Sequence, residues 1–287
     1  MDKDILSLIE QKRGEFSKGQ SRIARFIKES FDKAAFMTAA RLGRTVGVSE
    51  STVVRFASEL GFEGYPEMRR ALQEMIRNRL TSVQRIEVAK IVMDTKETLT
   101  SILESDIEKI RMTMESVDRQ KFNLAVTEIL KARRIYIIGT RTSAALSVFM
   151  GFYFNLLFDN VTILQDSAAS AVYEQILRIS SDDVVIGISF PRYSKRTVKA
   201  LRFSRDMGAT VIGITDAETS PLAKIASINL FAKSDMVSFV DSLVGPLSLI
   251  NALIVAVGTG TQEKLNNTFE ELERIWDEYE VYEKAED

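Results

Sequence analysis

Cysteine and histidine are both absent from the 287 residues of this chain. Without cysteine the chain can form no disulfide bond and no thiolate metal site. Without histidine it lacks the commonest metal ligand and the commonest general base at neutral pH. These absences weigh against metal-dependent and histidine-dependent catalysis, and we expect neither a metal nor a cofactor.

Long apolar runs are also missing. No stretch reaches the length of a membrane-spanning helix, and the opening residues MDKDILSLIE do not have the pattern of a signal peptide. We therefore expect a cytoplasmic protein that has no membrane partner. Hydrophobic residues make up 45% of the chain and charged residues 27%, which is typical of globular proteins, and the length is sufficient for two domains with separate cores.

Charge is distributed unevenly along the chain. Residues 1–80 carry 15 Lys and Arg against 11 Asp and Glu, whereas the remaining residues carry 23 against 29. A basic first quarter followed by an acidic remainder fits a nucleic-acid-binding module joined to a second domain. A surplus of this size also arises by chance, so the motifs must decide between the two explanations.

Apolar periodicity predicts two parts of different structural class. Residues 1–80 have helical periodicity throughout, and helical periodicity continues to residue 133. After that, short β-branched runs alternate with helical ones, which predicts a five-stranded parallel sheet flanked by helices. The predicted strands are 135–138, 161–164, 184–188, 210–214 and 228–231. We expect an all-α domain over 1–80, a helical linker over 81–117, and an α/β domain with a C-terminal helix over 118–287.

The first motif is the run TAARLGRTVGVSESTVVRFASELGF, which begins at Thr38. Two helices separated by a tight turn at Gly47 have the helix-turn-helix layout, in which the second helix reads DNA. If Val53 and Phe56 are buried, a polar side of the second helix faces outward. The candidate DNA contacts on that side are Ser49, Ser51, Thr52 and Arg55. Arginine suits a guanine or a phosphate, and short hydroxyls suit the DNA backbone; the alternative is an ordinary corner of two helices with a solvated polar face.

These residues resemble the RpiR family of bacterial transcription regulators. The pattern VS-x-S/A-TV-x-RF of that family is matched by residues 48–56, and its LGF-x-GY is matched by residues 60–65. The resemblance implies a regulator of sugar or amino-sugar metabolism genes that binds double-stranded operator DNA. Because one helix-turn-helix reads only a half-site, we expect a homodimer or a larger homo-oligomer.

The second motif is the run VVIGISFPRYSKRT, which begins at Val184. It predicts a parallel strand buried on both faces, then a polar loop, then a helix. The N-terminus of a helix presents unpaired N–H groups and the positive end of the helix dipole. Ser189 and Ser194 add hydroxyl donors to this loop and Arg192 adds a positive charge, so we predict that the loop binds a phosphate group.

A comparable loop follows the first predicted strand, in IYIIGTRTSAAL. Both loops resemble the ligand loops of sugar isomerase (SIS) domains, which have the patterns Gly-x-Gly-x-Ser and Ser-x-Ser-Gly-x-Thr. Ser143 matches the serine of the first pattern, while Arg141 replaces its second glycine. Ser189 matches the second pattern, in which Arg192 and Ser194 replace the glycine and the threonine. The resemblance implies a phosphosugar bound by Ser143, Ser189 and Ser194, with Arg192 as a helper.

Three alternatives remain open for these loops. The hydroxyls of the first loop could serve only to cap a helix, and the substitutions in the second could have removed the pocket and left a dimerisation fold. The pocket could also belong to a sugar-phosphate aldose–ketose isomerase, since SIS isomerases use a carboxylate and often a histidine. No histidine exists here, Arg196 stands where such isomerases often have Glu, and Glu174 is the remaining candidate base. We therefore favour a sensor over an enzyme, with a ligand that changes operator affinity.

Overall fold

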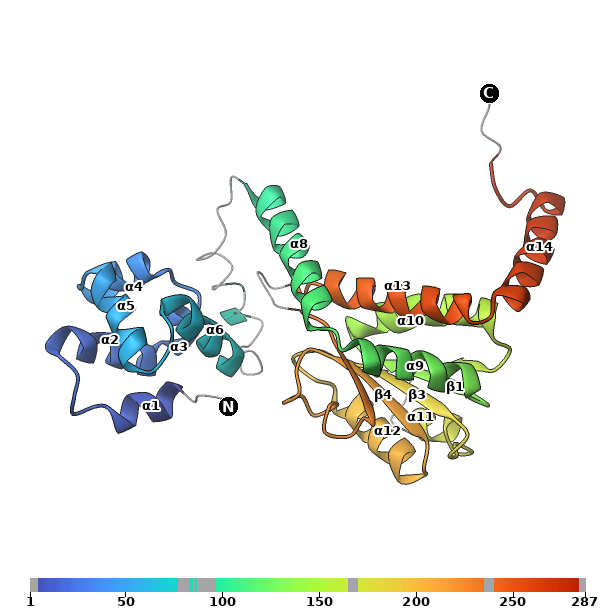
Figure 1. Ribbon diagram of the computed structural model, residues 1–287, viewed down its shortest axis with the longest axis horizontal. Coiled ribbons are helices and arrows are strands. Elements are labelled where there is room, and N and C mark those ends of the chain that lie inside the picture. The colour runs from blue at the N-terminus through green and yellow to red at the C-terminus, as the bar shows by residue number, and fades with distance from the viewer. Residues whose placement is uncertain are drawn as a thin grey trace. The chain divides into compact units, whose positions relative to one another are not determined.

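The computed structural model describes residues 5–76, 83–84, 86, 97–164, 170–234 and 240–283. It divides into two compact units, one built on helices α1 to α6 and the other on a β-sheet and the helices around it (Figure 1). Residues 81–82, 85 and 87–96 of the predicted linker, which spans 81–117, lie outside the described residues. The helix that follows them, α8, spans Thr98–Ser116.

The first unit is helical in its described residues, as predicted. Its helices are α1 (Ile5–Gln11), α2 (Lys18–Glu29), α3 (Phe31–Ala34), α4 (Ala39–Val46), α5 (Glu50–Glu59) and α6 (Tyr65–Ile76). One core joins them, with Ile27, Leu42 and Phe56 fully buried. Ser17 caps α2 through a reciprocal pair of hydrogen bonds with Gln20, in which each side chain accepts from the other residue's backbone N–H.

The second unit contains a five-stranded sheet with all strands parallel, which confirms the predicted fold class. Its strands are β1 (Ile135–Gly139), β2 (Val161–Ile163), β3 (Val184–Ile188), β4 (Thr210–Thr215) and β5 (Ile228–Phe231). Their order is β2-β1-β3-β4-β5. The chain therefore places β2 on one side of β1 and places β3, β4 and β5 on the other side. The direction in which strands are added reverses between β1 and β3. Both of these strands are completely buried.

Helices cover both faces of the sheet (Figure 1). One face packs against α9 (Arg119–Lys131), α10 (Ser143–Leu157) and α13 (Val244–Thr259), and the other against α11 (Ala171–Gln175) and α12 (Lys195–Asp206). The last helix, α14 (Gln262–Glu278), leaves α13 at an angle of 101°. No single helix in the described part of the chain is long and apolar enough to cross a membrane; α13 and α14 meet that test only as a bent pair.

The amino-terminal edge of the sheet is held by an ion pair. Arg133, which precedes β1, contacts Asp183, which precedes β3, through Nη2–Oδ2 at 2.7 Å and Nε–Oδ1 at 3.0 Å. The hydrogen bond and the negative charge of Asp183 raise the pKa of Arg133 above its ordinary value. The ion pair thus holds the start of β1 beside the start of β3.

Candidate functional site

Helices α4 and α5 form a helix-turn-helix whose ends are set by local hydrogen bonds. Thr38 caps α4, with its hydroxyl accepting from the N–H of Arg41 at 3.2 Å. Gly47 ends α4 in the left-handed conformation, φ +72°, which favours glycine. At Gly43 an added Cβ would lie 2.8 Å from the carbonyl oxygen of Val48, so a side chain there would push the turn away. The small residue at position 43 therefore permits the close approach of α4 to the turn.

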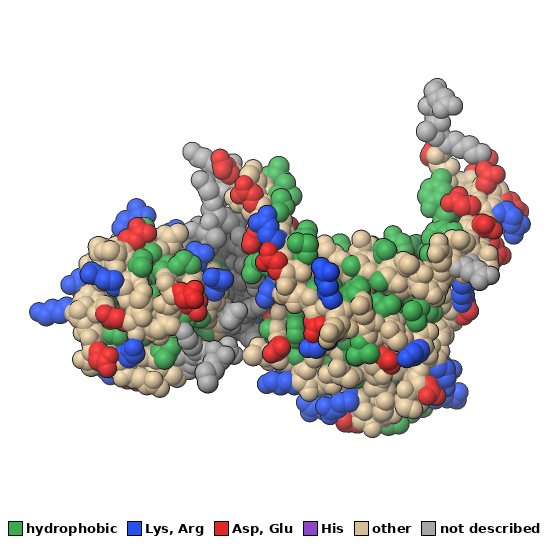
Figure 2. Space-filling model, viewed as in Figure 1, with side chains coloured by type: hydrophobic (Ala, Val, Ile, Leu, Met, Phe, Trp, Pro, Cys, Tyr) green, Lys and Arg blue, Asp and Glu red, His purple; other side chains and the backbone are tan. Residues whose placement is uncertain are grey.

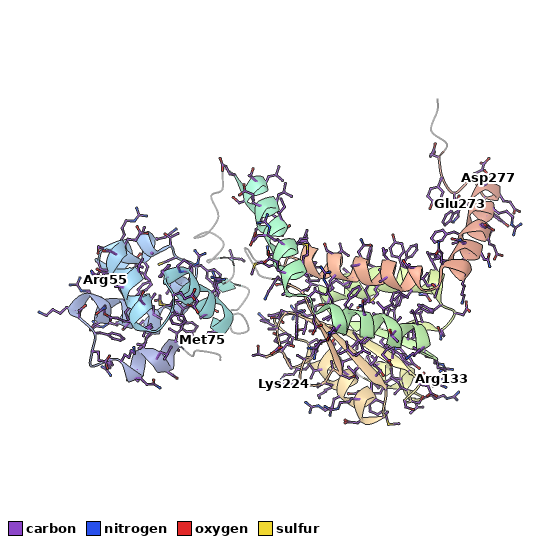
Figure 3. All side chains as sticks on the ribbon, in the orientation of Figure 1. Arg55, Met75, Arg133, Lys224, Glu273 and Asp277 are labelled. Atoms are coloured by element: carbon purple, nitrogen blue, oxygen red, sulfur yellow. The ribbon has the colours of Figure 1, made fainter. Side chains whose placement is uncertain are left out.

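The outward side of α5 carries the four candidate DNA contacts. Ser49 caps α5 by accepting from the N–H of Thr52 at 3.3 Å, and its hydroxyl lies 2.9 Å from that of Ser51 and 2.8 Å from that of Thr52. Arg55 is exposed and makes no hydrogen bond or ion pair to a described residue (Figure 3). The structure thus brings three hydroxyls together at the start of α5, with an exposed guanidinium one turn further along.

A further arginine lies beside the turn. Arg22, on α2, donates a hydrogen bond from Nη1 to the carbonyl oxygen of Gly47 at 3.2 Å. No local sequence pattern predicts this contact, because 25 residues separate Arg22 from Gly47. Its position adds a positive charge next to the start of α5.

The candidate ligand loops meet at the carboxyl-terminal edge of the sheet. Gly139 of β1 pairs with Ile188 of β3, so Thr140 and Ser189 are the first residues beyond the paired ends of two adjacent strands. The strand order reverses at this point. In open α/β sheets, ligands bind in the crevice outside the carboxyl ends of the strands at such a reversal.

Ser189 and Ser194 are in direct contact within the loop that follows β3. The N–H of Ser194 donates to Oγ of Ser189 at 3.1 Å, and the N–H of Thr197 donates to Oγ of Ser194 at 3.3 Å, which caps α12. Both hydroxyl oxygens thus accept from the backbone, and neither donates its own proton to a described residue. Two O–H donors are therefore available beside the N-terminus of α12, as an anion requires.

Ser143 begins α10 at the end of the neighbouring loop and is 4% exposed. Its hydroxyl makes no hydrogen bond to the described residues, which include Ser189 and Ser194. The two loops are linked instead through Thr140 and Thr197, which have their hydroxyl oxygens 3.4 Å apart. Three candidate serines therefore lie at one edge of the sheet, but only two of them are in direct contact.

The backbone of the β1 loop compensates for its departure from the SIS pattern. Arg141, which replaces the second glycine, has a φ of +58°, in the left-handed region that glycine favours. At Gly139, where the glycine is retained, an added Cβ would lie 2.3 Å from Oγ of Ser147, so α10 packs directly against the end of β1. The substitution at Arg141 has thus left a loop conformation that a glycine would adopt readily.

Arg192 is exposed and lies between Ser189 and Ser194 in the loop after β3. The same loop is tied to β4 by Tyr193, whose hydroxyl donates to Oδ1 of Asp216 at 2.8 Å, an oxygen that also accepts from the Thr215 hydroxyl at 3.1 Å. The remaining candidate base, Glu174, is exposed on α11. Among the described residues, no cluster of acidic side chains could hold a metal ion.

A buried polar cluster fastens α8 to the segment between β5 and α13. The side chain of Lys109 is 6% exposed and lies 3.3 Å from the carboxylate of Asp106, which accepts from the Ser242 hydroxyl at 2.7 Å. The Thr113 hydroxyl accepts from the N–H of Lys233 at 2.9 Å. Since Lys233 follows β5, α8 is attached close to the edge of the sheet that carries the ligand loops. These contacts span 120 and 136 residues of sequence, so no local sequence pattern predicts them.

Residues 3–79 match the family described as "Helix-turn-helix domain, rpiR family", and residues 128–256 match the SIS domain. The chain belongs to the RpiR family. The first match covers α4 and α5 of this RpiR protein, and the second covers the sheet with both ligand loops. The resemblance seen in the sequence motifs is thereby confirmed.

Two curated relatives are similar over most of the chain. An uncharacterised HTH-type transcriptional regulator of Clostridium perfringens is 25% identical over 227 residues, which are 79% of this chain and 80% of the relative. A second uncharacterised HTH-type transcriptional regulator, from Caldanaerobacter subterraneus subsp. tengcongensis, is 23% identical over 274 residues, which are 94% of this chain and 95% of the relative. Both names describe regulators.

Two solved structures have the same architecture. The sugar isomerase domain of an RpiR transcription factor from Sphaerobacter thermophilus is 28% identical, with a TM-score of 0.59, and the match covers 61% of this chain and 97% of that one. The Vibrio vulnificus NanR protein, described as complexed with ManNAc-6P, is 20% identical with a TM-score of 0.57, and the match covers 99% of this chain and 100% of that one. These likenesses show the fold, the first over 61% of this chain and the second over 99% of it.

Proposed function

We propose that this RpiR-family protein is a transcriptional regulator with an affinity for operator DNA that changes when a phosphosugar binds in its SIS domain. One observation carries the proposal: one chain contains a helix-turn-helix with an exposed polar face and a sheet edge at which two hydroxyls donate to no described residue. The target genes are those of sugar or amino-sugar metabolism. The curated relatives that match most of the chain carry regulator names, which supports this assignment.

The DNA-binding side of the proposal rests on α5. Arg55 reads a base edge or a phosphate, because its guanidinium is exposed and is not engaged with described residues. Ser51 and Thr52 contact the DNA backbone, and Ser49 acts mainly by capping the helix whose N-terminus faces the DNA. Arg22 adds a phosphate contact beside the turn. The DNA-binding domain spans residues 1–80, and two copies are needed to read two half-sites.

The ligand-binding side of the proposal rests on the two loops at the sheet edge. Ser189 and Ser194 donate their hydroxyl protons to the phosphate, the N-terminus of α12 contributes its dipole, and Arg192 contributes charge. Ser143 donates from the neighbouring loop. The Vibrio vulnificus neighbour is described as complexed with ManNAc-6P, and we extend a ligand of that class, a sugar phosphate, to the SIS domain over residues 118–287.

Among the described residues, the carboxylates considered as the base of an isomerase at this edge are either hydrogen-bonded or exposed, so we propose that the protein is not an enzyme. Moving a proton between adjacent carbons requires a base within hydrogen-bond reach of the substrate. The chain has no histidine, Asp216 accepts hydrogen bonds from Tyr193 and Thr215, and Glu174 is exposed on α11. Binding without turnover fits a sensor in the cytoplasm that responds to a metabolite.

A thermal-shift screen against a panel of phosphorylated hexoses and amino sugars tests the proposal, with the unphosphorylated sugars as matched controls. We expect one or a few phosphosugars to raise the melting temperature in proportion to the logarithm of their concentration, since ligand binding to the folded state stabilises it by mass action. Each stabilising compound is then incubated with the protein and analysed for aldose–ketose exchange. Turnover at an enzymatic rate would overturn the assignment as a regulator without catalysis.

A further inference from the structure

Two helix N-termini meet at the carboxyl-terminal edge of the sheet, because each ligand loop leads into a helix. Helix α10 begins at Ser143 and α12 begins at Lys195, and the two helices cover opposite faces of the sheet. The hydroxyl oxygens of Thr140 in the first loop and Thr197 in the first turn of α12 lie 3.4 Å apart. Each N-terminus presents unpaired N–H groups and the positive end of a helix dipole. The edge therefore has two neighbouring positions with the polarity that suits an anion.

The first turn of α12 lacks a negative charge of its own. Its first two residues, Lys195 and Arg196, are exposed cations, which the helix dipole repels. Helix α9 also begins with a cation, Arg119, but there the carboxylate of Asp118 caps the helix and accepts from two backbone N–H groups at 2.9 and 3.1 Å. The cap of α12 is Ser194, which is neutral. A phosphate bound at this position supplies the charge that Asp118 supplies to α9.

The start of α10 has a cation and a hydroxyl donor that lack partners among the described residues. The Arg141 side chain is exposed and makes no hydrogen bond or ion pair to any of them. Its φ of +58° is one that a glycine adopts more readily, so the backbone conformation does not explain an arginine here. Ser143 is 4% exposed, and its hydroxyl also has no partner in the described part of the chain. A buried donor and a guanidinium at one helix N-terminus indicate a ligand group that accepts from both, as an anion does.

Positive charge exceeds negative charge in the described loops at this edge. Arg141 and Arg192 stand at glycine positions of the SIS patterns, and Arg196 stands where SIS isomerases often have Glu. The acidic residues of the adjacent loop after β4 are Asp216, which is buried and hydrogen-bonded, and Glu218, which is exposed. The three replacements in the ligand loops change the charge in the same direction, which indicates a ligand more negative than a single phosphate ester.

The positive charge continues from the ligand loops along α12. The sequence of this helix, KRTVKALRFSRD, contains five Lys and Arg residues against one acidic residue, Asp206. Lys and Arg side chains are visible along the lower edge of the second unit, on the side of the sheet that α12 covers (Figure 2). By contrast, the chain after residue 80 carries 23 Lys and Arg against 29 Asp and Glu. A positive field on this side of an acidic domain attracts strongly negative ligands to the loops.

We propose that the effector of this protein carries two anionic groups, a phosphate at the start of α12 and a carboxylate or second phosphate at the start of α10. Arg141 and Ser143 bind the second group, while Ser189 and Ser194 bind the phosphate. The ligand class is therefore a phosphorylated sugar acid or a sugar bisphosphate. This inference rests on the proposed function, because it narrows the class of ligand that binds at the same edge.

One small molecule reaches both positions because the two loops are neighbours. Strands β1 and β3 are hydrogen-bonded to each other, and such strands lie about 4.8 Å apart. Thr140 and Thr197 contact each other between the two helix starts. A sugar with an anion at each end makes its second contact within one complex, so its affinity exceeds that of two separate ions. The second anion should therefore decide which phosphosugar binds most tightly.

Isothermal titration calorimetry of the full chain with matched sugars tests the inference. Glucose 6-phosphate, 6-phosphogluconate and glucose 1,6-bisphosphate share one phosphorylated end and differ at C1. The same three forms of the other aldohexoses and amino sugars in the thermal-shift panel complete the set. We expect the tightest ligand to be doubly anionic and to bind at least about tenfold more tightly than the matching 6-phosphate. The tighter of the two doubly anionic forms, acid or bisphosphate, identifies the second group.

Arg141→Gly is the decisive variant, because it removes the guanidinium and places at this position the residue that most readily adopts positive φ. It should reduce the preference for the doubly anionic form to near unity. Arg141→Lys should retain part of the preference, since the charge remains while the planar fork is lost. The matched control is Arg202→Ala on α12, an exposed cation about two helical turns beyond the start of the helix. The control should leave the preference unchanged.

A 6-phosphate that binds as tightly as its doubly anionic forms would overturn the inference and leave the proposed function intact. Absence of binding by every compound would overturn both. A preference that survives in folded Arg141→Gly, judged by an unchanged melting temperature without ligand, would contradict the role given to Arg141. If Arg141→Gly does not fold, Arg141→Asn replaces it, since asparagine also tolerates positive φ.

Discussion

The hydroxyl of Ser242 donates a hydrogen bond of 2.7 Å to the carboxylate of Asp106, across 136 residues of sequence. The same carboxylate lies 3.3 Å from the ammonium group of Lys109, which is almost completely buried. One acidic side chain thereby connects α8 with the segment that leads into α13. Removal of Asp106 affects both partners at once.

We predict that Asp106→Ala lowers the free energy of unfolding of the second unit by about 2 to 4 kcal/mol, because it leaves a buried ammonium without this carboxylate. The matched control is Glu108→Ala on the same helix. Glu108 also pairs with a cation three residues away, Arg111 at 3.2 Å, but both of those side chains are more than half exposed. The control should lose at most about 0.5 kcal/mol. Urea denaturation of both variants measures the difference, and equal losses would contradict the structural role given to Asp106.

The double variant Ser189→Ala/Ser194→Ala should abolish the response to phosphosugar and leave DNA binding intact, because it removes the two O–H donors beside α12. Loss of the Ser194 cap also costs about 1 kcal/mol of stability. Asp118→Ala serves as a control, since Asp118 caps α9 by accepting from the N–H groups of Gln120 and Lys121. The Asp118→Ala variant should lose a similar free energy of unfolding and keep the response to phosphosugar. Isothermal titration calorimetry measures sugar binding, and an operator-binding assay measures the response. A response that survives in the double variant would mean that the ligand binds elsewhere.

Replacement of Arg55 distinguishes base reading from phosphate contact. If Arg55 contacts a base edge, Arg55→Ala should weaken binding to the preferred operator by about 1 to 3 kcal/mol and leave binding to random DNA largely unchanged. Arg70→Ala, at an exposed arginine on α6 of the same unit, is the control and should have a smaller effect on specificity. Fluorescence anisotropy on both DNAs gives the two affinities. An equal loss on operator and random DNA would restrict Arg55 to phosphate contact.

The raised pKa of Tyr65 leads us to predict that the free energy of unfolding of the first unit falls at high pH. Burial raises the pKa of Tyr65 to about 12 from its ordinary value near 10, and its hydroxyl donates to the carbonyl oxygen of Met37 at 2.9 Å. The unfolded state therefore loses the phenol proton at lower pH than the folded state does. The contribution of protonated Tyr65 to the free energy of unfolding is fully present below about pH 10. This contribution, of the order of 2 kcal/mol, is lost between about pH 10 and 12. Tyr65→Phe should show a smaller decline over that interval in urea titrations, and an identical decline would contradict this assignment.

Features set by nearby residues could be predicted from the sequence. The helix-turn-helix follows from local signals, since Thr38 and Ser49 cap helices within three residues and Gly47 ends a helix at positive φ. The five parallel strands follow from short apolar runs, which are buried on both faces in β1 and β3. In each case the residues that determine the element lie within a few positions of one another in the sequence.

Other features depend on contacts that local patterns do not contain. Both Ser17 and Ser21 are possible caps of α2 by residue type, and Ser17 is the cap because Gln20 completes a reciprocal pair with it. The bond from Tyr193 to Asp216 joins two loops, and only the order of the strands brings these loops together.

The most direct test of the central claim is a titration of a fluorescent operator complex with phosphosugar. The operator is first selected from genomic fragments by the protein itself, and the sugar is the one that stabilises the protein most in the thermal-shift screen. We predict a saturable change in operator affinity of about 5- to 150-fold, which corresponds to a coupling free energy of about 1 to 3 kcal/mol. The unphosphorylated sugar should cause no change. A phosphosugar that stabilises the protein but leaves operator affinity unchanged would contradict the account.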